Sequence, residues 1–394
     1  MKKIKQIKQL WLVILAVSLM SGMQIDLQGQ TTQPSNSSQT PEFKPSGKVW
    51  GYVFADYYYK THADSLSRGK TQYAGKTYPK NYNAFAFRRI YLGYDYNISE
   101  HFSTELLLTH EGDVVDPSGD RSVYIKAANL RWKNILPNND LIVGQMGTPI
   151  YSTVSEKVWS YRSIEKTVTD MRGLGSSNDL GIAWQGKLND KGDFGYNFMV
   201  ANGTAQKLEI DKYKKIYGEI YAKLMDQKII IDLTSDYEPS STTQSKTTIH
   251  GMIAYQTDPI TIGIEVVSQT QKNYAVDSAN GTNTNANLVP FGFSAFLRGQ
   301  IIHEKLNYFA RFDNYNPDTK FSTSTLYPKA SPYPANKYSE NFITAGLDFM
   351  PVKNVHVMPN IWVDSYKNKL SNVSGMAKSD YDMTLRLTVY YIFR

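Results

Sequence analysis

The feature that most constrains this fold is a long succession of segments in which apolar and polar residues alternate. About sixteen such segments, each of roughly 9 to 14 residues, follow one another from residue 47 onward. In the last one, Leu385, Leu387 and Val389 form one face, and Thr384 and Arg386 belong to the other. A side-chain period of two is that of a β-strand with two different faces. The sequence therefore predicts an antiparallel, all-β protein.

The connections between these segments alternate between short and long. The short ones are rich in turn residues and lie at 97–100, 137–140, 189–193, 225–228, 303–305 and 350–354. The long polar ones lie at 60–83, 112–120, 148–178, 202–212, 238–245, 271–288, 314–339 and 367–379. A soluble β-sandwich also alternates its faces, but it does not predict this rhythm. Short turns at one rim and long loops at the other are typical of a transmembrane β-barrel, expected here over residues 47–394.

Composition supports a barrel whose outer face contacts lipid. The mean hydropathy is −0.43, yet 13% of the residues are aromatic, and 29 of them are tyrosine. Tyrosine favours the boundary between membrane and water, and lumen-facing polar residues keep the average hydropathy of a barrel low. The absence of cysteine excludes disulfides and thiolate metal sites.

The N-terminus predicts export. Four lysines precede an apolar run from Leu10 to Met20, which is the pattern of a secretory signal peptide, expected at residues 1–29. Residues 30–46 are polar and predict a flexible periplasmic tail. The formal net charge of +7 would fall to about +4 beyond residue 29, too little and too dispersed for a nucleic-acid partner. The expected location is the bacterial outer membrane, with its lipid as a partner.

The third long connection, 148–178, is the longest and predicts a loop that folds into the lumen as a constriction. A stretch within 152–169 predicts a helical turn or two. Seven charged residues of both signs are candidates to set a transverse field there: Glu156, Lys157, Arg162, Glu165, Lys166, Asp170 and Arg172. The alternative is an external loop with a solvated helix.

The alternation also predicts charged residues on the pore wall. These candidates are Arg88, Arg89, Glu105, Asp232, Glu265, Arg298, Arg311, Asp348 and Arg386. Such charges select solutes, or they pair across the lumen and only brace the wall. Arg88 and Arg89 are adjacent, so one of them is expected to point away from the lumen and to lie near a rim.

No enzyme signature is present. The six histidines lack metal-ligand spacing, and no nucleophile-elbow motif occurs. We therefore expect neither catalytic residues nor a metal or other cofactor, and we do not expect an enzyme.

Several motifs resemble one known family. The run from Phe87 to Gly93, FRRIYLG, and the strand with Glu105 to Leu108 resemble the first strands of the phosphate-selective porin O/P-like family. Val143-Gly144-Gln145 with Pro149, then 179–182 and 198–203, resemble its following segments. The resemblance covers about residues 47 to 205 and implies a sixteen-stranded porin, commonly a homotrimer.

The function expected from these features is passive diffusion of small hydrophilic solutes, with an anion or phosphate preference as a finer hypothesis. Two alternatives stay open. One is a gated transporter for a specific substrate, and the other is a surface barrel whose loops bind a partner.

Overall fold

The computed structural model describes residues 43–68, 78–112, 114–278, 282–322, 325–326, 338–369 and 379–394. The predicted signal peptide and nearly all of the predicted tail lie outside the described residues. Among these residues, no helix is long and apolar enough to cross a membrane.

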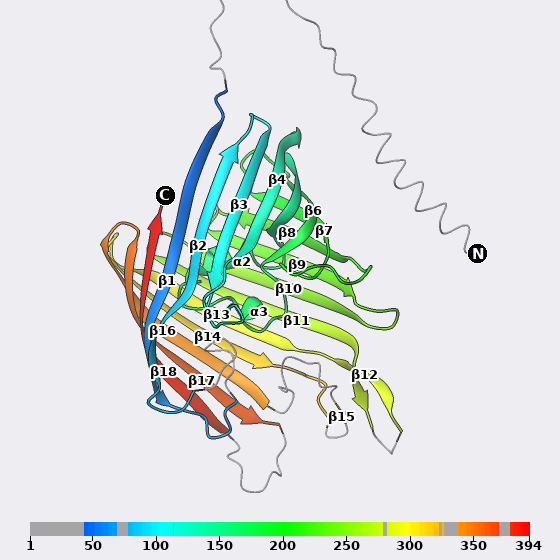
Figure 1. Ribbon diagram of the computed structural model, residues 1–394, viewed down its shortest axis with the longest axis vertical. Helices are drawn as coiled ribbons and strands as arrows, with labels where there is room; N and C mark the ends of the chain where they lie inside the picture. Colours follow the sequence, from blue (N-terminus) through cyan, green and yellow to red (C-terminus); the bar gives the residue numbers. More distant parts are fainter. Residues whose placement is uncertain are drawn as a thin grey trace, which may run out of the picture. The chain divides into compact units, whose positions relative to one another are not determined.

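The described residues from Lys44 onward form a closed antiparallel barrel of sixteen strands (Figure 1). Its strands are β1 (Ser46–His62), β2 (Asn83–Asn97), β3 (Phe102–Glu111), β4 (Tyr124–Leu136), β5 (Asn139–Gly147), β6 (Asn178–Lys187), β7 (Phe194–Ala201), β8 (Lys215–Leu224), β9 (Ile229–Pro239), β10 (Ser245–Gln256), β11 (Ile260–Asp277), β13 (Phe291–Ile302), β14 (Leu306–Asn316), β16 (Tyr338–Val352), β17 (Val355–Asn368) and β18 (Ser379–Phe393). The predicted fold class is confirmed.

Pairing of the first strand with the last closes the barrel. β1 pairs with β2 on one side and with β18 on the other, with Gly51 opposite both Leu92 and Phe393. Among the sixteen barrel strands that the structure describes, each one pairs antiparallel with a neighbour on both sides, so none of these strands leaves an edge facing lipid.

Part of the predicted connection 271–288 is regular structure, so that expectation was wrong in detail. β11 runs on to Asp277 and pairs with the short strand β12 (Thr284–Leu288) and with the two-residue strand β15 (Thr325–Leu326). The residues of this extension are mostly polar, with only Ala275 and Leu288 as buried apolar positions, so the sequence predicts a loop here. Backbone pairing orders it together with side-chain hydrogen bonds, such as the one from Gln244 Nε2 to the Asn273 carbonyl at 2.9 Å.

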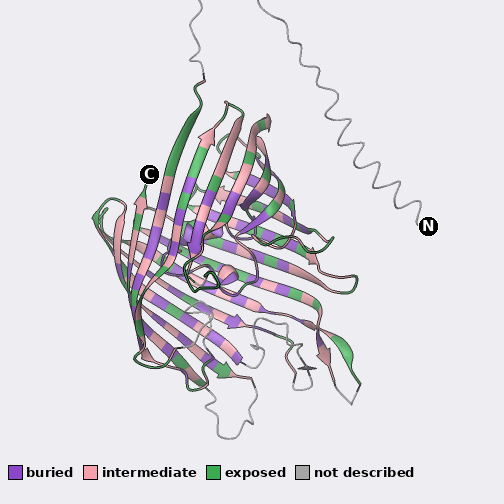
Figure 2. Ribbon diagram, in the orientation of Figure 1, coloured by how far each residue is buried: buried purple, intermediate pink, exposed green. Residues whose placement is uncertain are grey.

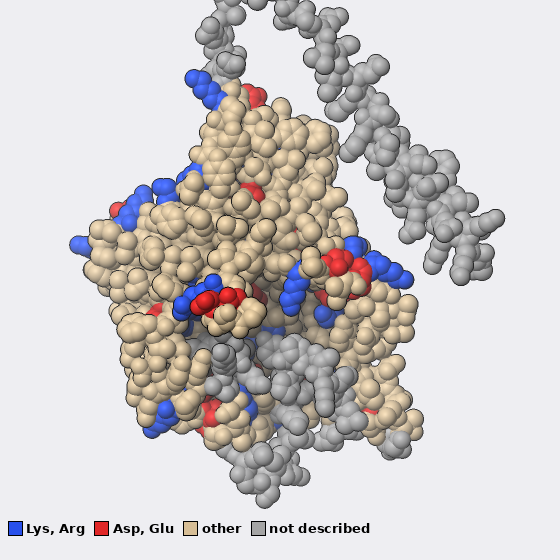
Figure 3. All heavy atoms as spheres, viewed as in Figure 1, with Lys and Arg blue, Asp and Glu red and all other residues tan. Residues whose placement is uncertain are grey.

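The two faces of the strands differ as the alternation predicts. Along β18, Asp382, Thr384 and Arg386 are buried, whereas Leu385 and Leu387 are exposed. Figure 2 shows the same alternation of buried and exposed positions along neighbouring strands, and Figure 3 shows few charged side chains on the outer face over β1 to β4. The exposed side chains are mostly large and apolar, which suits a face turned to lipid.

Candidate pore constriction

The long connection between β5 and β6 folds into the lumen. It contains two short helices, α2 (Ser155–Trp159) and α3 (Val168–Met171), which Figure 1 shows within the ring of strands. Trp159 packs edge-on against Phe296 of β13, with ring centroids 5.3 Å apart, and Tyr161 packs against Phe309 of β14 at 4.5 Å. Val168 packs with Val267 of β11 in a second buried cluster. This part of the prediction is confirmed, because an external loop would not bury these rings.

A glycine permits the close approach of α3. A Cβ atom added to Gly292 of β13 would lie 3.1 Å from Val168 Cγ2 and 2.9 Å from Val267 Cγ1. A side chain at position 292 would push α3 away from the wall. Because glycine has no side chain, the loop can pack directly against β13.

Arginines of the wall hold the loop through its backbone. Arg298 Nε donates to the Val158 carbonyl at 3.0 Å, and Arg311 Nη1 donates to the Lys166 carbonyl. Arg88 Nη1 donates to the Ser163 carbonyl at 3.1 Å and also to that of Ile164. Charge-assisted hydrogen bonds of this kind are the strong ones. The three arginines therefore fix three points along the loop.

Wall carboxylates hold loop side chains. Thr169 Oγ1 donates to Glu265 at 2.7 Å, and the Tyr161 hydroxyl donates to Asp348 at 3.1 Å. These bonds satisfy buried oxygens that would otherwise be costly to desolvate.

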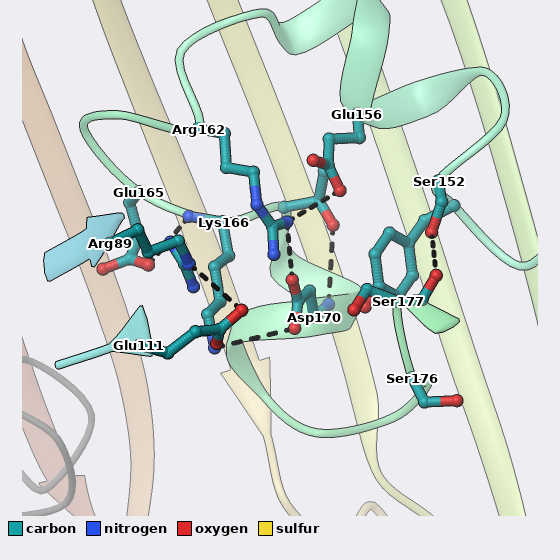
Figure 4. A network of polar contacts seen from close by, with 12 residues as sticks. Arg89, Glu111, Ser152, Glu156, Arg162, Glu165, Lys166, Asp170, Ser176 and Ser177 are labelled. Carbon is teal, nitrogen blue, oxygen red and sulfur yellow. Dashed lines mark hydrogen bonds and ion pairs between the residues drawn. The ribbon is translucent and has the colours of Figure 1, made fainter. Parts of the chain in front are cut away.

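The side of the loop that is not packed on the wall carries its own ion-pair network. Arg162 Nη1 lies 2.7 Å from Glu156 Oε2 and 2.8 Å from Asp170 Oδ2, and Lys166 Nζ lies 3.7 Å from Asp170 Oδ1. Figure 4 shows Arg89 and Glu111 of the wall turned toward this network. Charges of the loop and of the wall therefore face one another.

The wall opposite the network has the same mixed character. Glu111, at the end of β3, is bound by Lys126 Nζ of β4 at 2.6 Å and by Arg89 Nε of β2 at 3.5 Å. Tyr91 donates to the same carboxylate at 3.2 Å. The constriction thus combines basic groups of Arg89, Lys126, Arg162 and Lys166 with acidic groups of Glu111, Glu156 and Asp170.

The two loop carboxylates of the network differ in how firmly they stay ionised. Burial alone would raise the pKa of Asp170, but Lys166 and Arg162 outweigh burial and lower it to about 2. Burial raises the pKa of Glu156 despite the attraction of Arg162. Glu156 is thus the carboxylate of this pair that accepts a proton first on acidification.

The structure divides the seven predicted loop residues into two sets. Glu156, Lys157, Arg162, Lys166 and Asp170 lie on the partly open side. Glu165 and Arg172 are buried against the wall, where they pair with Arg88 and with Glu340 respectively. The last two brace the loop, because the backbone turns them toward the strands.

Five of the nine predicted wall residues contact the loop. Arg88, Arg298, Arg311, Glu265 and Asp348 bind the loop, as described. Arg386 pairs with Asp56 and lies 3.7 Å above the Trp362 ring, and Asp232 is fully buried. Arg89 is buried and pairs with Glu111, whereas Glu105 is only partly buried.

The expectation that Arg88 and Arg89 point to opposite faces was wrong. A β-bulge occurs where Phe54 pairs with Arg89 and the next residue, Ala55, pairs with Phe87. Arg88 is the extra residue, so both arginines turn into the lumen.

Some residues at the constriction were not predicted from the sequence. Glu111 and Lys126 lie next to a polar connection and look like loop residues, and a second bulge in β3–β4 pairing shifts the parity at Lys126. The one sequence signal for Glu111 is the alternation of β3, which places this residue on the lumen face when it is continued to the end of the strand.

Two cavities lie between the loop and the strands near the short-turn end of the barrel. Their volumes are about 690 Å³ and about 630 Å³, and Arg131, Lys133 and Lys157 border both. They place water-accessible space directly beside the loop. In the described part of the chain, no three His, Asp or Glu side chains are grouped so as to hold a metal ion.

Known structures share this architecture. The outer membrane channel DcaP of Acinetobacter baumannii matches with a TM-score of 0.64 and 13% identity, over 89% of this chain and 99% of that one. The anion-selective porin from Comamonas acidovorans matches with a TM-score of 0.55 and 11% identity, over 89% and 100%. OprB of Pseudomonas putida matches with a TM-score of 0.58 and 8% identity, over 88% and 94%.

No protein-family model matches the sequence, and no curated protein matches it either. The likeness therefore shows the fold, a porin-type sixteen-stranded barrel. The resemblance to the phosphate-selective porin O/P-like family stays an interpretation of the motifs.

Proposed function

We propose that this chain is an outer-membrane porin that lets small hydrophilic solutes diffuse passively. The observation that carries the proposal is the loop between β5 and β6. It lies inside the barrel, packs its apolar side chains on β11, β13 and β14, and leaves Arg162 and Asp170 on its partly open side. Mixed charges beside water-accessible space select solutes by size and sign. As an outer-membrane porin, the barrel would lie in the membrane with its short turns facing the periplasm. A signal peptide at 1–29 would direct its export.

A modest preference for anions follows from the charges near the constriction. Arg89, Lys126, Lys157, Arg162 and Lys166 are basic, whereas Glu111, Glu156 and Asp170 are acidic, so positive charge is in excess. Because most of these charges are paired, we expect a weak preference and no dedicated phosphate path.

The gated and the partner-binding alternatives have less support. Three arginines hold the loop backbone, so it is fixed rather than free to swing. A barrel used only as a binding surface would not need an internal loop with mixed charges on its open side.

A homotrimer is also proposed, from the family resemblance. The apolar outer face supplies surface for contact with lipid or with another copy. Native mass spectrometry in detergent would give three chains per particle, and a purely monomeric species would contradict this part.

The test of the porin proposal is single-channel conductance of the refolded protein in a planar bilayer, with reversal potentials in a salt gradient and phosphate titration. Steady ohmic steps with a weak anion preference are expected. Absence of conductance from a correctly folded barrel would refute the open channel, and saturable block by phosphate would favour a phosphate-selective porin.

A further inference from the structure

The smaller cavity has the features of a ligand site of its own. It lies between Ser152 and Lys157 of the loop and the lumen face of the first strands, and its volume is about 630 Å³. Small-molecule sites usually have 300 to 1,000 Å³, an apolar or aromatic wall and a few well-placed polar groups. This cavity has an aromatic wall on one side and a wall of polar groups on another.

The aromatic wall starts at Trp50 of β1. Trp50 pairs with Gly93 of β2, and a Cβ atom on Gly93 would lie 2.3 Å from Trp50 Cε2 and 2.5 Å from Cζ2. The indole therefore lies across the glycine on the lumen side of β2, a position that any larger residue there would block. Trp50 is only partly buried and borders the cavity, so part of the ring is accessible.

Further rings continue this wall along β1. The Tyr52 ring is 6.1 Å from that of Trp50 with an interplanar angle of 22°, and Phe54 follows 5.4 Å from Tyr52 at 19°. Tyr91 of β2 lies 4.5 Å from Tyr52 and fixes its position. Rings at alternate positions of one strand thus lead from the cavity toward the constriction.

The polar wall is a row across three strands. Asp95 of β2 pairs with Glu105 of β3, which pairs with Asn129 of β4. Asn129 Nδ2 donates to Glu105 Oε2 at 2.9 Å, and this bond orients the carboxylate toward the lumen. Each carboxylate has two oxygens that accept hydrogen bonds, so the row offers acceptors at the spacing of neighbouring hydroxyl groups.

The charges of this cavity nearly cancel. Asp95 and Glu105 oppose Arg131, Lys133 and Lys157 around it. Lys133 Nζ donates to Asn97 Oδ1 at 2.8 Å, and Arg131 Nη1 lies 3.5 Å from Asp140. A free anion would meet two carboxylates, and a free cation would meet three basic groups. A neutral polar solute avoids both costs.

We infer that this cavity is a binding subsite for a neutral polyhydroxylated solute of the sugar class. The C–H face of the ring would lie on Trp50, and adjacent hydroxyls would donate to Asp95 and Glu105. The inference rests on the proposed function, because it names a solute class for the same lumen.

Calorimetric titration of the folded, detergent-solubilised protein with maltose tests the subsite without requiring conductance. Saturable binding is expected, about tenfold weaker in Trp50→Ala and nearly unchanged in Trp184→Ala, whose ring borders neither cavity. Asp95→Asn with Glu105→Gln gives a second test that leaves the aromatic wall intact. Heat-shifted gel mobility verifies that each variant is folded.

The outcomes separate this inference from the porin proposal. Saturable maltose binding that both cavity variants weaken supports the subsite, whatever the conductance. Absence of maltose binding to wild type, or binding that neither variant changes, overturns the subsite, even when ion conductance is normal. Absence of ion conductance refutes the porin proposal alone.

Discussion

Removal of the Trp159 side chain should loosen the constriction loop while leaving the barrel intact. Trp159 is almost fully buried, packs on Phe296 and Phe309, lies under the Arg311 guanidinium, and donates from Nε1 to the Glu165 carbonyl at 2.8 Å. Truncation of a buried Trp to Ala typically costs about 3 to 5 kcal/mol. The cost falls on loop docking, because the strands keep their complete backbone hydrogen bonding.

That cost corresponds to a factor of about one hundred to several thousand in the ratio of undocked to docked loop. Single-channel recordings of Trp159→Ala should show frequent upward current steps that are rare in wild type. Trp159→Phe keeps a ring and loses only the hydrogen bond, worth about 1 kcal/mol, so it should give about fivefold more such steps. Identical current statistics in a folded Trp159→Ala and in wild type would refute the assignment of this residue as a loop anchor.

Three further predictions concern the charges and the packing of the loop. Arg162→Gln removes one positive charge, which at about 6 Å in water attracts an anion and repels a cation by about 0.7 kcal/mol each. The anion-to-cation permeability ratio from reversal potentials should therefore fall about tenfold, and an unchanged ratio would place Arg162 away from the ion path. Acidification from neutral pH should protonate Glu156 before Asp170, because the pKa of Glu156 is raised and that of Asp170 is about 2, so anion preference should rise as pH falls in wild type. Glu156→Gln should lack this first rise, and an identical pH profile would contradict the assignment. Gly292→Leu should displace α3 at a cost of about 1 to 3 kcal/mol and make the current noisier, with thermal unfolding of the barrel as the control; a quiet channel would contradict the close approach.

The strands could be predicted from the sequence because each one encodes two faces. Leu385 and Arg386 need different surroundings, and only a two-sided strand with its turns at fixed places provides them. The internal loop could be predicted from the length and charge of 148–178. The strand faces and the long charged loop both depend on residues that are close together in the sequence, so they can be predicted without a structure.

The orientation of individual charges could not be predicted in the same way. A single extra residue at Arg88 reverses the parity of β2 against β1, and nothing in the local sequence marks a bulge. Glu165 and Arg172 look like Glu156 and Arg162 in the sequence. Their separation depends on which loop residues pack on the distant strands β13, β14 and β16.

The sequence left two roles open for the charged residues of the wall, which either select solutes or brace the wall. The structure indicates that different residues have different roles. Arg88, Arg298 and Arg311 donate to backbone carbonyls of the loop, so their hydrogen-bonding capacity is largely spent on holding it. Removing one of them would leave a buried carbonyl without its donor and displace the loop, and the altered selectivity would be a consequence of that displacement. Arg89 is buried as well, but it contacts no loop carbonyl among the described hydrogen bonds and pairs instead with Glu111 of the wall. Its neutralisation would change the field at the constriction directly, so the two groups of arginines are separable by comparing current noise with permeability ratio.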